Sequence, residues 1–235
     1  MTYQPNTVIS GDECKHCEER FCAVSSLTDQ QLNLLQDNCR ELTLRKNEHI
    51  YHQGSLTSHI VYLRTGLVME YKKADNGREQ IVQIIKSRSY LGLHSLFGDR
   101  VNHYSYKAIE DIKVCFIDVE AFKQLVRNNG DFGYGILVSV CKESLNSHHR
   151  FLNINAKQTY GKVADALLYF SRVVYETDEF VLPVTREELG SLVGITREST
   201  TRTLTRFQQE GFIRIKGQQV TILEPAQLEK ISRTG

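Results

Sequence analysis

The sequence predicts an α+β protein in which a strand-rich segment and a helical segment flank one long helix. Short alternating apolar and polar runs separated by turn residues fill Glu41 to Val119. Apolar residues then recur at spacings of three and four from Asp131 to Ile154. Two short helical patterns meet at Val193-Gly194-Ile195. The predicted parts are an N-terminal segment 1–26, a strand-rich domain 27–130, a long helix 131–155 and a C-terminal domain 156–235.

Length and composition narrow the class of protein. A chain of 235 residues can bury a substantial core in one or two domains. No apolar run approaches the roughly 18 residues that a membrane-spanning helix needs, and no signal peptide opens the chain. We therefore expect a cytoplasmic protein with no membrane partner. In that reducing compartment the six cysteines suit metal or redox chemistry better than disulfides.

The N-terminal segment carries three closely spaced thiols. Cys14, Cys17 and Cys22 give C-x2-C-x4-C in a short polar stretch without helical or strand period. Such thiols suit a soft metal, for which a fourth ligand is needed. The candidates for that fourth ligand are His16, Cys39, Cys115 and Cys141. A C-x-x-C pair also occurs in thiol-redox enzymes, but no βαβ pattern flanks it here, and we predict no enzyme.

The strand-rich domain follows a helix. An amphipathic helix is expected from about Leu27 to Cys39, with Cys39 as a small buried hydrophobe near its end. The strand-like runs after it are punctuated by glycines, and Asn76-Gly77 is a strong hairpin signal. Many short strands at this spacing predict a sandwich or rolled barrel. Taken by itself, Cys115 in the strand VCFI is a core thiol.

The apolar stripe of the long helix has two interpretations. It can dock on the strand-rich domain, or it can form a coiled-coil-like seam with a second copy of the chain. The position of the helix between two domains favours the seam, and thus a homodimer. The positions are Ile136 or Leu137, Val140 or Cys141, Leu145 or Ser144, His148, and Phe151 or Leu152. A further amphipathic helix is expected over Lys162 to Tyr175.

The C-terminal domain contains the pattern of a helix-turn-helix. Thr185 and Glu188 form a capping box at the start of the first helix, and Gly194 lies at the sharp turn. Thr196 is the expected N-cap of a second helix that reaches about Glu210. The following sequence FIRIKGQQVTIL predicts a β-hairpin wing.

The second helix of this pair carries charges suited to double-stranded DNA. Arg197, Glu198 and Arg202 fall in its first turns, largely on one side. Arginine can bond guanine O6 and N7 together, and glutamate can accept from cytosine N4. Between Gly194 and Gly217 there are five basic and two acidic residues, an excess of 5 − 2 = 3 positive charges for a phosphate-facing surface. The alternative is that Glu198 and Arg202 form only a surface ion pair.

Several motifs together resemble the CRP/FNR family over Leu27 to Ile222. They are Gly54, Tyr62-Leu63-Arg64-Thr65-Gly66, Asn76-Gly77-Arg78-Glu79-Gln80-Ile81 and TREELGSLVGITRESTTRTLTRFQQEGFI. The resemblance implies a cyclic-nucleotide-binding-like β-roll sensor, a long dimerisation helix and a winged helix-turn-helix. It also implies a dimeric transcription regulator that acts with RNA polymerase. Residues similar to the family's phosphate contacts are Arg186, Thr196 and Ser199.

The cyclic-nucleotide branch of the family is distinguished by a Gly-Glu pair and a later Arg-Ser or Arg-Thr. Here Leu93 stands at the glutamate position, and Arg100 is out of register with the phosphate-binding arginine. Because a phosphate needs that charge-assisted clamp, we expect no cyclic AMP binding.

The oxygen-sensing branch holds a [4Fe-4S] cluster through three N-terminal cysteines and one in the β-roll. Cys14, Cys17 and Cys22 resemble the first three, and Cys115 resembles the fourth. The resemblance therefore implies an oxygen- or NO-labile cluster. The C-x2-C-x4-C loop is one residue shorter than the commonest family pattern. A sensor of haem, nitric oxide or another ligand remains the alternative, with the cysteines as structural zinc ligands or vestigial.

One residue helps to predict the base sequence of the DNA half-site. The oxygen-sensing branch commonly lacks an arginine directly before the base-reading glutamate, whereas this chain has Arg197 there, as the cyclic-nucleotide branch does. We therefore predict a palindromic operator with half-sites closer to TGTGA than to TTGAT.

Overall fold

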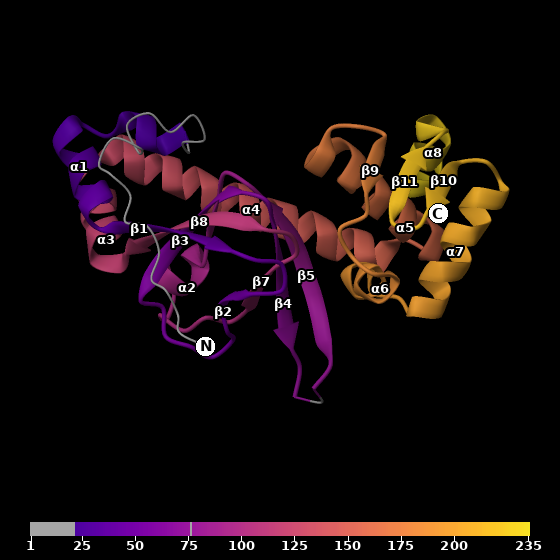
Figure 1. Cartoon of the computed structure of the whole chain (residues 1–235), viewed down its shortest axis with the longest axis horizontal. Coiled ribbons are helices and arrows are strands. Elements are labelled where there is room, and N and C mark those ends of the chain that lie inside the picture. The colour runs from indigo at the N-terminus through magenta and orange to yellow at the C-terminus, as the bar shows by residue number, and fades with distance from the viewer. Residues whose placement is uncertain (1–21, 76) are drawn as a thin grey trace. The chain divides into compact units, whose positions relative to one another are not determined.

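The computed structural model describes residues 22–75 and 77–235, the side chain of Cys22 excepted, and its chain forms two compact units. One unit contains the described residues from Cys22 to Gly77 and Val82–Ser144. The other contains Arg78–Ile81 and Leu145–Gly235. Figure 1 labels the elements of both units. The predicted α+β class is confirmed.

Two short helical segments open the described chain. They are the 3-10 helix η1 (Cys22–Ser26) and the helix α1 (Asp29–Asp37). A capping box starts α1, because the Gln31 N–H donates to Thr28 Oγ1 at 3.3 Å and the Thr28 N–H donates to Gln31 Oε1 at 3.1 Å. The prediction that this helix runs to Cys39 is wrong. Asn38 ends it and accepts from the Asp118 N–H at 2.9 Å, so that Cys39 already belongs to a strand.

The strands of the first unit roll into two packed sheets, as predicted. One sheet has the order β1-β8-β3-β6 and the other has the order β2-β7-β4-β5. The short helix α2 (Leu93–Phe97), which the sequence patterns did not predict, follows β6. The strands are β1 (Cys39–Leu44), β2 (His49–Tyr51), β3 (His59–Thr65), β4 (Leu67–Lys73), β5 (Glu79–Lys86), β6 (Ser89–Leu91), β7 (Ser105–Ala108) and β8 (Ile112–Asp118).

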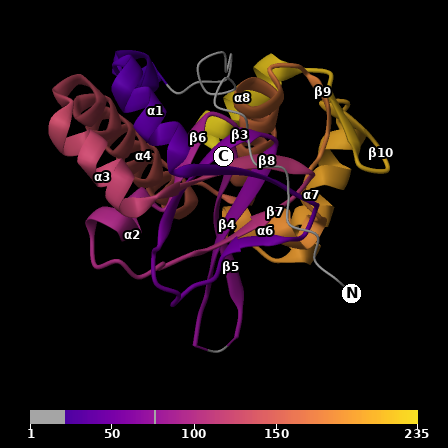
Figure 2. The ribbon, with the colours of Figure 1, turned by 60° about the vertical axis from the view of Figure 1, so that its left-hand side comes forward.

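Successive side chains of β3 and β8 point to opposite faces of the sheet and so belong to two separate cores. Val61, Leu63 and Val114 belong to the core that includes residues of both sheets. The intervening residues Tyr62 and Cys115 face the opposite way, into a core shared with helices. Figure 2 shows α1, α3 (Val119–Asn128) and α4 (Gly130–Ala156) gathered beside the roll.

The long helix α4 confirms the predicted helix, with its ends at Gly130 and Ala156. Its apolar stripe divides between two environments. Phe132 and Ile136 are buried in the helix-covered core of the first unit. Leu137 and Leu152, by contrast, are 58% and 60% exposed. The stripe therefore docks on the roll at its start and also presents uncovered apolar side chains.

The second unit combines helices with a small sheet of order β10-β11-β9. The helix expected over Lys162 to Tyr175 is found as α5 followed by the π-helical segment η2, while β9 and α8 were not predicted. The elements are α5 (Thr159–Tyr169), η2 (Phe170–Tyr175), β9 (Glu179–Val181), α6 (Arg186–Val193), α7 (Arg197–Gln209), β10 (Ile213–Lys216), β11 (Gln219–Ile222) and α8 (Pro225–Thr234). None of the described helices has the length and apolar character to cross a membrane.

Candidate nucleic-acid interface and sensor core

Local sequence fixes the two helices of the helix-turn-helix. The Glu188 N–H donates to Thr185 Oγ1 at 3.1 Å, and the Thr185 N–H donates to Glu188 Oε2 at 2.8 Å, which completes the predicted capping box. Gly194 ends α6 in the left-handed region at φ 71°. Thr196 then caps α7 by accepting from the Ser199 N–H at 3.2 Å.

The crossing of α6 and α7 depends on a glycine. A Cβ atom on Gly190 would lie 2.8 Å from the Ile195 carbonyl oxygen and 2.9 Å from Thr200 Oγ1. Only a residue without a side chain allows α7 to approach α6 this closely. The buried side chains of α7, among them Leu204 and Phe207, then face the core, and the opposite side of the helix remains uncovered.

The three predicted base-reading residues lie on that uncovered side. Arg197, Glu198 and Arg202 are all exposed. Among the described residues no ion pair joins Glu198 to Arg202. Instead, Arg202 Nη2 donates to Ser199 Oγ at 3.4 Å. The alternative that these charges only neutralise one another is therefore not supported by this geometry.

Glu198 is held in its ionised form by the start of α7. A hydrogen bond from its own backbone N–H and one from the Thr196 hydroxyl lower the pKa of this carboxyl group, with a smaller contribution from the Arg197 charge. Free N–H groups at a helix N-terminus favour a negative charge in this way. Glu198 therefore presents a carboxylate acceptor at neutral pH.

A cleft of about 410 Å³ joins the start of α6, the start of α7 and the wing turn. Its polar lining includes Thr185 and Arg186 from α6, Arg197 from α7 and Gln218 from the wing. Arg186 Nη1 is buried and makes no hydrogen bond, and desolvation lowers the pKa of this guanidinium. Arg186 thus contributes a cationic side chain to the lining of the cleft, and a guanidinium there is suited to an anion such as a DNA phosphate.

The predicted wing is a tight antiparallel hairpin. Lys216 pairs with Gln219, so that only Gly217 and Gln218 form the turn. Gly217 and Gln218 also line the cleft. The wing turn and Arg197 of α7 thus line the same cleft.

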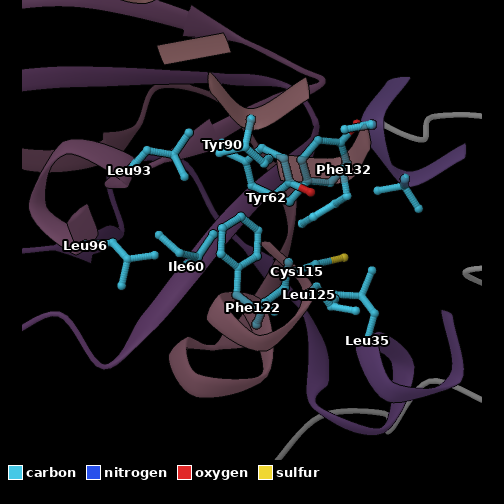
Figure 3. Packing of buried hydrophobic residues seen from close by; sticks show 14 of the residues in the cluster. Leu35, Ile60, Tyr62, Tyr90, Leu93, Leu96, Cys115, Phe122, Leu125 and Phe132 are labelled. Atoms are coloured by element: carbon cyan, nitrogen blue, oxygen red, sulfur yellow. The ribbon is translucent and has the colours of Figure 1, made fainter. Parts of the chain in front are cut away.

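In the first unit, the predicted metal ligand Cys115 lies in the helix-covered core. Its side chain is 6% exposed and points into the cluster, with Leu35, Phe122 and Leu125 around it (Figure 3). Cys14, Cys17 and the thiol of Cys22 lie outside the described residues. Among the described residues no group of three His, Cys, Asp or Glu side chains forms a ready metal site.

The residues that follow Cys22 nevertheless belong to the cluster around Cys115. Ala23 and Val24 in η1 are 6% and 8% exposed and are buried in that cluster. A Cβ atom on Gly135 of α4 would lie 2.5 Å from the Ala23 Cβ, so that η1 packs directly on the long helix. The backbone next to Cys22 is therefore placed against the same core as Cys115.

Sequence reasoning missed a buried polar group between the strands of the roll. Glu70 on β4 is 2% exposed and accepts hydrogen bonds from Gln83 Nε2 and, at 2.9 Å, from the Tyr106 hydroxyl. Gln83 Nε2 also donates to Glu143 Oε1 of α4 at 3.2 Å. Desolvation raises the pKa of Glu70, opposed by the two hydrogen bonds, and the Glu143 charge raises it further. The only sequence signal was a glutamate between the apolar residues Met69 and Tyr71.

Leu93, at the glutamate position of a cyclic-nucleotide clamp, and the nearby Arg100 both have other roles. Leu93 is 2% exposed in the helix-covered core. Arg100 is exposed and pairs with Glu120, with Nη2 and Oε1 2.7 Å apart.

Comparison with known proteins agrees with this architecture. Residues 161–231 match the Crp-like helix-turn-helix domain, and residues 41–129 match the cyclic nucleotide-binding domain. The transcriptional activator protein FnrA of Stutzerimonas stutzeri is 27% identical over 217 residues, which cover 90% of this chain and 88% of that protein. The fumarate and nitrate reduction regulatory protein of Vibrio cholerae is 26% identical over 234 residues, or 95% and 92% of the two chains. FixK2 from Bradyrhizobium japonicum has a similar fold, with a TM-score of 0.77 and 21% identity over 84% of this chain and 98% of that one.

These domains define a DNA-binding transcription regulator with a sensor domain of the cyclic-nucleotide-binding type, and not an enzyme. The chain belongs to the CRP/FNR family.

Proposed function

We propose that this regulator is a homodimer whose sensor region carries an oxygen- or NO-labile [4Fe-4S] cluster, held by Cys14, Cys17, Cys22 and Cys115. The observation that carries the proposal is the burial of Cys115 in the cluster into which Ala23 and Val24 also pack. A relative named for fumarate and nitrate reduction supports the same branch of the family.

The four proposed cysteine ligands are suited to a [4Fe-4S] cluster. Four thiolates are the usual ligands of such a cluster. Cys115 is surrounded by apolar side chains, and a water-poor shell of this kind limits solvent access to a metal group. When bound, the cluster supplies a centre that reacts with oxygen or nitric oxide.

The chain's own residues can convert ligation into a change at the dimer helix. A Cys115 thiolate on β8 and a Cys22 thiolate at the start of η1 together tie η1 to the roll. Because Ala23 packs on Gly135, that tie also holds η1 on α4. Without ligation, η1 would no longer be tied to the roll, and the packing of α4 would be free to change. The helix α4 would then be the two-state element that such coupling requires.

The uncovered side of α4 is the proposed dimer contact. Tyr134, Leu137, Leu145 and Leu152 are each more than half exposed, and they recur at spacings suited to a helical seam. A second copy of α4 would cover them. This arrangement would place two helix-turn-helix units on a palindromic operator, where half-site spacing mirrors the dimer.

On DNA, we propose that Arg197, Glu198 and Arg202 contact bases of a TGTGA-like half-site. Arg186, which lines the cleft, contacts a phosphate. The N-terminal residues Thr196 and Ser199 of the recognition helix contact phosphates through N–H and hydroxyl groups. RNA polymerase is the expected protein partner of the DNA-bound dimer.

We also propose that the roll does not bind cyclic AMP. The buried Glu70 carboxyl group accepts hydrogen bonds from Gln83 and Tyr106, neither of which is a cation. Leu93 and Arg100 are committed to the core and to Glu120. Neither Leu93 nor Arg100 is therefore available to clamp a phosphate.

The visible spectrum of anaerobically purified protein tests the cluster. A broad absorbance near about 400 nm that air bleaches, with iron and sulfide bound, is expected for a thiolate-held cluster. The double variant C39A/C115A should lose it, and Cys141→Ala, which removes an exposed thiol, should keep it. A sharp Soret band would instead establish haem, and a colourless zinc-loaded protein would establish the structural-zinc alternative that the short cysteine loop leaves open.

A further inference from the structure

A second thiol lies on the same face of the roll as Cys115. Strands β1 and β8 are antiparallel, with Cys39 opposite Ile117 and Glu41 opposite Cys115. Opposed residues share a face of the sheet, as do alternate residues along one strand. Cys39 and Cys115 are therefore diagonal neighbours on one face, a relation in which Cα atoms are about 7–8 Å apart.

Both thiols meet the same apolar cluster. Cys115 is buried within it, and Cys39 is partly buried and packs against it. Ala23 and Val24, which directly follow Cys22 in the chain, belong to this cluster as well. Cys141 is exposed and belongs to no such cluster among the described residues, so that it differs from the other two.

The diagonal separation distinguishes two kinds of thiol chemistry. A disulfide usually requires Cα atoms no more than about 6.8 Å apart, so this pair would form one only with backbone movement. Shared ligation is less demanding, because each sulfur binds the metal and not the other sulfur. Replacement of one ligand by the other requires only that either sulfur can come within a metal–sulfur bond length, about 2.3 Å, of the same metal group.

We propose that Cys39 and Cys115 form a single two-thiol site for a soft metal group, in which Cys39 supplies a ligand when Cys115 is lost. This inference rests on the proposed function. In the exchange, the Cys39 thiol releases its proton to water, and its thiolate forms the metal–sulfur bond that Cys115 would otherwise make. Together with the proposed ligands Cys14, Cys17 and Cys22, these two cysteines would offer one thiol more than a four-thiolate cluster needs.

The test compares four proteins purified without oxygen: the full-length wild type, Cys115→Ala, the double variant C39A/C115A and the matched double variant C115A/C141A. Iron, sulfide and zinc per chain are measured for each. Cys115→Ala and C115A/C141A should retain equal amounts of metal. The C39A/C115A protein should retain at least about tenfold less metal per chain, because loss of a supporting residue typically weakens metal binding by about 10- to 100-fold.

Two results would overturn the proposal, and they are distinguishable. If wild type binds metal but Cys115→Ala and C39A/C115A bind equal amounts, Cys39 is not a ligand and the proposed function stands. If wild type binds neither iron nor zinc, both inferences fail. Thermal unfolding of each variant checks its fold, and the serine pair Cys115→Ser and C39S/C115S replaces any alanine variant that unfolds.

Discussion

Arg197 offers the sharpest test of how this regulator recognises DNA. Its side chain is exposed at the first position of α7, and the described structure gives it no ion pair. Replacing it with alanine should therefore change the free energy of unfolding by no more than about 0.5 kcal/mol, as for an ordinary surface position. A guanidinium that bonds guanine O6 and N7 contributes about 1–3 kcal/mol of discrimination at one base pair.

The expected effect on DNA binding follows from that figure. Loss of about 1–3 kcal/mol corresponds to roughly 5- to 150-fold weaker binding at the G·C position of one half-site. The preference among bases at this position should weaken, while preferences at other positions remain. In a symmetric dimer the loss applies at both half-sites, and well-separated positions are roughly additive.

Competition binding at fixed salt, with a panel of duplexes that vary one base pair of the half-site, measures this preference. Arg206→Ala is the matched control, because it removes the same charge from α7 at a residue that pairs with Glu210 near the end of the helix. It should lower affinity evenly across the panel or leave it unchanged. Unaltered base preference in Arg197→Ala would refute the assignment of Arg197 to base reading.

Three further predictions address the phosphate contact, the helix crossing and the buried acid. Arg186→Ala should weaken binding to all duplexes evenly and reduce the slope of log affinity against log salt by about 1, which a salt titration measures; an altered base preference would contradict a phosphate role. Gly190→Ala should lower the free energy of unfolding by about 1–3 kcal/mol, because its Cβ would lie 2.8 Å from a carbonyl oxygen, whereas Gly130→Ala, with open space around its Cβ, should not. Glu70→Gln should stabilise the protein increasingly as pH rises above about 4.3, the ordinary glutamate value. Burial raises the pKa of Glu70, so the folded wild type binds a proton on this carboxyl group more tightly than the unfolded chain does. Between the ordinary pKa and the raised pKa, the wild type therefore loses stability relative to the variant as pH rises, by at most about 1.4 kcal/mol per pH unit. Parallel stability curves for the two proteins between pH 4 and pH 8, roughly the range of interest, would show that Glu70 does not titrate differently on folding.

The sequence by itself determined the elements whose signals are local. The capping box of Thr185 and Glu188, the left-handed Gly194 and the two-residue wing turn after Lys216 each depend on residues within a few positions of one another. Their geometry could be predicted because a cap or tight turn uses backbone groups that lie nearby in the chain. The exposure of Arg197, Glu198 and Arg202 followed from helical period once the apolar side of α7 was known.

The tertiary structure alone decided which distant strands pair and which side chains become buried. Cys39 was predicted at a helix end, but its pairing with Ile117 places it at the start of a strand beside Cys115. Glu70 is a buried acid because Gln83 and Tyr106, from other strands, surround it. Neither the pairing of Cys39 nor the burial of Glu70 could be predicted from a repeating sequence pattern. The register between strands far apart in the chain depends on the packing of whole sheet faces and not on local preference.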